Sequence, residues 1–153
     1  MANTYTQMYV HVVFAVWGRA NVIKDVNRVE VEKYVSGIVS NKRCKLLAIY
    51  INPDHTHLLF GLHPAISVSD LTRDVKANSS KFINEQGMVA GIFRWQDGFA
   101  SFTYSKSQLD KVVKYILNQP EHHKKETFKH EFLKLLKRNE IDFDDRYLFE
   151  WYE

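Results

Sequence analysis

The sequence has little of what holds small secreted domains together and lacks a nucleotide-binding loop. Its 153 residues include one cysteine, Cys44, so no disulfide can form within the chain, and a bacterial-type cytoplasm is the expected compartment. No glycine-rich P-loop motif is present to bind a nucleoside triphosphate. These shortages argue against a disulfide scaffold and against P-loop chemistry.

Long apolar runs and targeting signals are also missing. No apolar run approaches the ~20 residues of a membrane span. The first residues, MANTYTQMYVHVVFAVW, lack the basic start and the cleavage site of a signal peptide. We find no repeat, no low-complexity tract and no linker. With 45% apolar residues, the chain can build a real core, and we expect one domain over residues 1–153 with no membrane partner.

The charge of the chain is small overall but unevenly spread. The formal net charge is +3, and lysines gather between Glu121 and Arg138. The last stretch, residues 139–153, is acidic and aromatic. A basic body is compatible with a polyanionic partner, but a solvated helix face explains the same lysines. Charge alone therefore leaves both interpretations open.

The spacing of apolar residues predicts alternating strands and helices. The expected strands cover residues 7–17, 45–51, 55–63 and 100–105. The expected helices cover 26–41, 67–86 with Ser67 as N-cap, 105–119 ending before Pro120, and 124–139. This order predicts an α+β fold with a ferredoxin-like β-α-β-β-α-β antiparallel sheet, two helices on one face, and an added C-terminal helix that bears Tyr115.

Two histidines open the third expected strand in the sequence NPDHTHLLF. Side chains alternate along a strand, so His55 and His57 point to the same face, about 7 Å apart at Cα. Their ring nitrogens can converge on one metal ion. Thr56, Leu58 and Phe60 point the other way, toward the core under the two helices. Short H-x-H matches also arise by chance, and a metal site needs a third ligand.

The helix before Pro120 places a tyrosine away from its apolar face. Leu109, Val112, Val113, Ile116 and Leu117 form one stripe that we expect to be buried. Tyr115 lies off this stripe, and Gln119 lies one turn later on the same side. Such a pair suits a functional site, although a flanking tyrosine with a hydrated hydroxyl fits equally well.

The two motifs together resemble a known family. DHTHLLF, with VVKYILNQ about sixty residues later, resembles the single-tyrosine HUH transposases of the smallest, IS200-like bacterial insertion sequences, and their relatives the REP-associated tyrosine transposases. HUH stands for histidine, a bulky apolar residue, histidine. The resemblance runs from the first strand to about Phe132 and includes SVSDLTRDVKANSSKFINEQ. One departure is visible, because Thr56 replaces the bulky residue, and we expect a cost in packing only.

This resemblance implies a role for each site residue. His55 and His57 would bind a divalent metal, Mg²⁺ or Mn²⁺, with Gln119 as the third ligand and Tyr115 as the nucleophile. The expected enzyme cuts and rejoins single-stranded DNA through a 5′-phosphotyrosine intermediate, recognises hairpin ends, and thereby excises and inserts a small insertion sequence. The family also implies a homodimer in which the tyrosine helix of one copy serves the histidines of the other.

Further residues are candidates for DNA contacts. Amines, hydroxyls and amides suit phosphates, and aromatic rings suit base stacking. The candidates are Arg73, Lys76, Asn78, Ser79, Ser80, Lys81, Trp95 and Phe99.

Three other functions stay open at this point. A non-catalytic nucleic-acid-binding module of ferredoxin-like fold would leave the H-x-H motif unexplained, and the usual RNA-stacking aromatic pattern is missing. A domesticated relative that cuts chromosomal hairpins would share the same residues. A metallo-hydrolase that uses His55 and His57 to activate water predicts that Tyr115 is dispensable.

Overall fold

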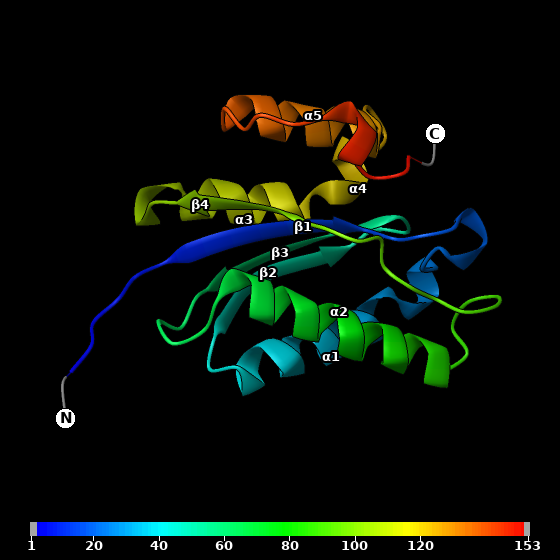
Figure 1. Cartoon of the computed structure of the whole chain (residues 1–153), viewed down its shortest axis with the longest axis horizontal. Helices are drawn as coiled ribbons and strands as arrows, with labels where there is room; N and C mark the ends of the chain where they lie inside the picture. Colours follow the sequence, from blue (N-terminus) through cyan, green and yellow to red (C-terminus); the bar gives the residue numbers. More distant parts are fainter. Residues whose placement is uncertain (1–2, 152–153) are drawn as a thin grey trace.

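A computed structural model describes residues 3–151 and contains one four-stranded sheet with helices on both faces (Figure 1). Within these residues no helix is long and apolar enough to span a bilayer. In chain order the elements are β1 (Tyr9–Ala15), η1 (Arg19–Asn21), α1 (Asp25–Asn41), β2 (Lys45–Ile51), β3 (His55–Gly61), α2 (Val68–Glu85), β4 (Ala100–Tyr104), η2 (Lys106–Gln108), α3 (Leu109–Leu117), α4 (Gln119–His122), α5 (Phe128–Arg138) and η3 (Asp145–Tyr147).

The sheet has the order β2-β3-β1-β4, and every neighbouring pair is antiparallel. This order confirms the predicted ferredoxin-like sheet. β1 is central, and its Val13 lies opposite His57 of β3 and Ala100 of β4. β1 is shorter than the predicted strand 7–17, because the next residue, Val16, makes only an isolated bridge to Trp95.

Helices α1 and α2 cover one face of the sheet (Figure 1). Leu58 and Phe60 of β3 are buried on this face in the larger hydrophobic cluster, as the alternation predicts. Ser67 caps α2 by accepting a hydrogen bond from the Asp70 amide at 3.0 Å. Gly87 follows α2 with φ of 62°, a left-handed conformation that ends a helix at little cost in glycine.

Helices α3, α4 and α5 lie on the opposite face (Figure 1). The helix predicted to run to Gln119 is wrong in its end, because α3 stops at Leu117 and Gln119 begins the separate α4. Pro120 explains the break, since proline has no amide proton and its ring clashes with the carbonyl four residues earlier. Leu117, predicted to be buried, is 55% exposed.

The last helix starts later than predicted. α5 begins at Phe128, and Thr127 caps it by accepting a hydrogen bond from the His130 amide at 3.2 Å. Phe128 and Phe132 pack on the sheet with Val13 and Ala15.

The described part of the acidic tail docks on its own chain. Phe149 lies 4.9 Å from the ring of Phe132, centroid to centroid. The Gln96 side chain accepts a hydrogen bond from the Glu150 amide at 2.7 Å and donates one to the Glu150 carbonyl at 2.9 Å. A third bond runs from the Gln96 side chain to the Val16 carbonyl at 2.9 Å, so one buried amide joins the tail to the residue that follows β1.

Candidate metal centre and nucleophile

The two histidines of β3 lie on the face covered by α3 to α5. Both are fully buried, and their ring centroids are 5.1 Å apart. The Nε2 atoms of His55 and His57 lie 3.3 Å and 3.1 Å from the same oxygen, Oε1 of Glu131. The sequence-predicted pair therefore converges on one point, and a carboxylate occupies it.

Glu131 comes from α5 and was missed by the sequence argument. One ligand atom from each of His55, His57 and Glu131 lies within 4.8 Å of the others, which suits a metal ion. Burial alone would raise the pKa of Glu131, but the surrounding histidines outweigh it and hold this pKa well below its usual range. A signal was present, because Glu131 lies on the buried stripe of α5 with Phe128, Phe132 and Leu135.

Gln119 is fully buried and contacts this cluster through Glu131. Its Nε2 donates to Oε2 of Glu131 at 3.1 Å. Its Oε1 accepts a hydrogen bond from Asn52 at 3.1 Å and lies 2.9 Å from Nε2 of His123. The amide oxygen therefore faces Asn52 and His123, while the amide nitrogen contacts Glu131.

Tyr115 lies in the last turn of α3, next to His57 of its own chain. Its ring centroid lies 5.8 Å from that of His57, and its hydroxyl donates a hydrogen bond to Glu131. Burial raises the pKa of Tyr115 far above its ordinary value, and the Glu131 carboxylate raises it further. The phenol is therefore held protonated, with a hydrogen-bond acceptor in contact.

Each metal-facing histidine has a different partner on its other nitrogen. Nδ1 of His55 lies 2.7 Å from a carboxylate oxygen of Asp54. Burial lowers the pKa of His55, but its bonds to Asp54 and Glu131 outweigh this and raise it above the ordinary value. Nδ1 of His57 lies 2.8 Å from Nε2 of His11, and burial holds the pKa of both rings below the ordinary value.

The donor set fits a divalent cation. Two imidazoles suit Mn²⁺ and related transition metals, and the carboxylate suits Mn²⁺ and Mg²⁺ alike. Asp54 behind His55 is the kind of partner that orients a ligating imidazole.

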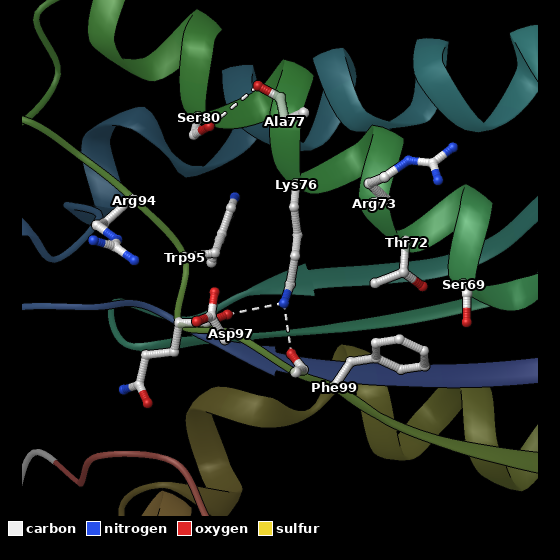
Figure 2. Close-up of a pocket in the computed structure, with 12 residues that line it drawn as sticks. Ser69, Thr72, Arg73, Lys76, Ala77, Ser80, Arg94, Trp95, Asp97 and Phe99 are labelled. Carbon is white, nitrogen blue, oxygen red and sulfur yellow. Dashed lines mark hydrogen bonds between the residues drawn. The ribbon is translucent and has the colours of Figure 1, made fainter.

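Five of the DNA-contact candidates line a pocket of about 450 Å³ on the other side of the sheet, between α2 and the segment 94–99 (Figure 2). They are Arg73, Lys76, Ser80, Trp95 and Phe99. Lys76 reaches from α2 to this segment and donates to the Gln96 carbonyl at 2.9 Å and to the Gly98 carbonyl. Burial lowers the pKa of Lys76 to about 8. Arg73 and Phe99 line the pocket on one side of Lys76, and Trp95 lies on the other (Figure 2).

Two of these candidates serve the fold. Ser79 is buried, and its hydroxyl accepts a hydrogen bond from the Trp95 indole at 2.9 Å. Trp95 is 6% exposed and packs edge-on against Phe14 and Phe93, so it offers little ring surface for a base. The exposed or half-exposed candidates on α2 are Arg73, Lys76, Asn78, Ser80 and Lys81.

Comparison with known proteins places this fold and site in context. A candidate transposase from Deinococcus radiodurans R1 is 21% identical, with a TM-score of 0.60 over 78% of this chain and 95% of that one. A REP-associated tyrosine transposase bound to a REP hairpin is 16% identical, with a TM-score of 0.57 over 80% of this chain and 73% of that one. These likenesses show a shared fold. No curated protein matches the chain.

A family model decides the relationship. The model described as IS200-like transposase matches residues 4–119, which is more than half of the chain and includes both histidines, Tyr115 and Gln119. Glu131 lies beyond the matched residues. The chain therefore belongs to the IS200-like transposase family.

Proposed function

We propose that this chain cuts and rejoins single-stranded DNA by transesterification through Tyr115, and so excises and inserts a small insertion sequence. The observation that carries the proposal is one cluster in which the Tyr115 hydroxyl donates to the Glu131 carboxylate, which also lies in contact with the buried His55 and His57. Family membership supplies the DNA-processing context.

The chemistry follows from the contacts of Tyr115. Its oxygen attacks the phosphorus of the scissile phosphodiester, an O–P bond forms, and the bond to the 3′ oxygen breaks. The products are a 5′-phosphotyrosine link and a free 3′-hydroxyl. The Glu131 carboxylate already accepts the hydrogen bond of the phenol, so the leaving proton has an acceptor in place. A 3′-hydroxyl can later reverse the step and join another strand.

A divalent cation belongs at the same place. His55, His57 and Glu131 would hold Mg²⁺ or Mn²⁺, with Gln119, which contacts Glu131, as an adjoining ligand. When bound there, the cation neutralises the charge of the scissile phosphate and orients it for displacement. Asp54 and His11 keep the two imidazoles in position.

The substrate is proposed to be a strand with hairpin ends. The structurally similar REP-associated transposase is bound to a REP hairpin, which supports a hairpin as the DNA form recognised. On this chain the pocket of Figure 2 and the exposed side of α2 offer Arg73, Lys76 and Ser80 for phosphates and Phe99 for a base. Asn78 and Lys81 extend the same helix surface.

The active site is proposed to be complete within one chain. Tyr115 already touches Glu131 of its own chain and lies beside its own His57. A homodimer would then bring two DNA ends together, and its tyrosines would have no need to exchange between copies.

The test is a cleavage assay on 5′- and 3′-labelled single-stranded DNA that carries hairpins from the DNA flanking the gene, with Mn²⁺ or Mg²⁺. Wild type is compared with Tyr115→Phe, His57→Ala and the control Tyr147→Phe, which alters an exposed tyrosine. We expect wild type and the control to form a denaturant-resistant protein–DNA adduct. Both site variants should form none.

Other outcomes favour other functions. Equal cutting by Tyr115→Phe would replace the proposal with a hydrolase that activates water. Binding of the hairpin without cutting in any metal would favour a binding module. Recognisable hairpin ends on both sides of the gene would indicate a mobile element, and their absence would indicate a domesticated hairpin-processing nuclease.

A further inference from the structure

A buried chain of three polar side chains leads to one of the two metal-facing histidines. His11 of β1 is fully buried, and its Nε2 lies 2.8 Å from Nδ1 of His57. Nδ1 of His11 lies 3.4 Å from the Tyr104 hydroxyl. The rings of His11 and His57 are stacked with centroids 5.1 Å apart. The chain Tyr104–His11–His57 thus crosses β4, β1 and β3 in turn.

Without a cation, the direction of these hydrogen bonds is determined by Glu131. A carboxylate can only accept hydrogen bonds, so Nε2 of His57, 3.1 Å away, must carry a proton. A neutral imidazole has one donor and one acceptor, so Nδ1 of His57 accepts from Nε2 of His11. Nδ1 of His11 then accepts from the Tyr104 hydroxyl. Burial, which lowers the pKa of His11 and of His57, is consistent with both rings being neutral.

A bound cation requires the opposite direction. Nε2 of His57 can be a ligand only through its lone pair, so the proton must sit on Nδ1. His57 then donates to Nε2 of His11, and His11 donates from Nδ1 to the Tyr104 oxygen. Each ring keeps one proton, and Tyr104 keeps its own, so the reversal neither releases nor takes up a proton.

We propose that His11 is a positioning residue that sets the tautomer of His57, and that the chain Tyr104–His11–His57 reverses direction when the divalent cation binds. The proposal rests on the proposed metal site. His55 differs, because its Nδ1 faces the Asp54 carboxylate, which can only accept. The proton on Nδ1 of His55 is therefore fixed, whereas that of His57 depends on a partner that can both donate and accept.

Replacement of His11 separates this role from packing. Phenylalanine would keep a ring among Phe102, Tyr104 and Tyr115 but would leave Nδ1 of His57 without a partner. Glutamine would keep an acceptor for the His57 proton. Loss of an outer partner of a metal ligand typically weakens metal binding ~10–100-fold.

The first measurement is the affinity for Mn²⁺ and for Mg²⁺ by isothermal titration calorimetry, without DNA. We expect His11→Phe to bind ~10–100-fold more weakly than wild type. His11→Gln should stay close to wild type, and Tyr104→Phe should lose less than His11→Phe. His63→Phe, which lies two residues beyond the end of β3 that is farther from the site, is the control and should bind as wild type does. Wild-type affinity in His11→Phe would overturn the proposal.

The second measurement is the protonated nitrogen of His57, read by ¹⁵N–¹H correlation in protein labelled at histidine. We expect the proton on Nε2 in metal-free protein and on Nδ1 with Mg²⁺, which is diamagnetic. The same tautomer in both states would overturn the proposal, and this readout needs no variant to fold.

If wild type binds no cation, the proposed metal site fails, and the proposed reversal fails with it. If wild type binds the cation and cuts DNA while its tautomer stays unchanged, only the present inference fails.

Discussion

Thr56 shows at the residue scale what a departure from the family pattern costs. It is buried between His55 and His57, and its hydroxyl has no hydrogen-bond partner among the described residues. It faces the side covered by α1 and α2, away from the candidate metal site. A buried hydroxyl without a partner destabilises a fold by about 1–3 kcal/mol. This unsatisfied hydroxyl is a polar cost of Thr56, separate from the packing cost that the sequence predicts.

We expect Thr56→Val to raise the free energy of unfolding by about 1 kcal/mol, because a methyl group replaces the unsatisfied hydroxyl at similar volume. Urea denaturation measures the change. Thr103→Val, at an exposed position on β4, is the matched control and should stay within about 0.5 kcal/mol of wild type. A less stable Thr56→Val protein would show that the hydroxyl is satisfied in solution.

Burial and the Glu131 carboxylate together raise the pKa of Tyr115. Removal of the carboxylate charge should therefore lower this pKa. We expect Glu131→Gln to shift tyrosine ionisation to lower pH in an ultraviolet absorbance titration. The shift should vanish when Tyr115→Phe is added. Glu121→Gln, which removes an exposed carboxylate on α4, should leave the titration unchanged.

The raised pKa of Tyr115 also determines how the stability of the protein changes with pH. A group whose pKa is raised on folding stabilises the fold below its unfolded pKa, near 10 for tyrosine, and loses that contribution as pH rises above it. Wild type should therefore go on losing stability above about pH 10 to a higher pH than Glu131→Gln does, because its Tyr115 keeps the higher pKa in the folded state. Loss of stability over the same pH range in both proteins would contradict the assigned cause.

The sequence predicts the histidine pair and Tyr115 of the candidate site, but not Glu131 or His11. His55 and His57 share a face because strand side chains alternate, and the structure brings them to Tyr115 and Gln119. Glu131 could not be placed, because α5 reaches the histidines only through tertiary packing. The contact of His11 with His57 could not be predicted, since nothing in the sequence indicates that β1 pairs with β3 in the required register.

At the scale of elements, a helix cap supports the cluster. Thr127 caps the start of α5, and Glu131 of α5 contacts the histidines. The predicted boundaries failed here and at α3 for local reasons, namely a threonine cap and Pro120. The strand order and the two-helix layer were predictable because they follow from apolar periodicity, which spans whole elements.

We expect Thr127→Ala to lower the free energy of unfolding by about 1 kcal/mol and to weaken Mn²⁺ binding, because fraying of α5 loosens Glu131. Ser67→Ala removes the equivalent cap from α2, on the other face of the sheet. It should cost similar stability and leave Mn²⁺ binding unchanged. Calorimetric titration with chemical denaturation measures both properties. Equal Mn²⁺ affinity in all three proteins would show that the cap does not support the metal site.

At the scale of the whole molecule, one chain contributes every residue of the cluster. The family resemblance implied a tyrosine from a partner copy, whereas Tyr115 here contacts Glu131 of its own chain. The two arrangements predict different results when a variant without the tyrosine is mixed with a variant without a histidine.

We expect a mixture of Tyr115→Phe and His57→Ala proteins to form no covalent adduct with DNA, because neither chain holds a complete site. Each variant mixed with wild type should leave the wild-type yield unchanged, which controls for inhibition. An adduct in the mixture of the two variants would show that tyrosines cross between copies. Gel electrophoresis under denaturing conditions measures the adduct.

A site completed by one chain also sets the kinetics of the proposed reaction. Attachment to a first DNA end would be first order in protein, and its rate per chain would survive dilution. Each chain has a single Tyr115, which stays occupied until a 3′-hydroxyl releases it. Exchange between two ends would therefore need two loaded chains to meet, so dilution would separate cutting from joining.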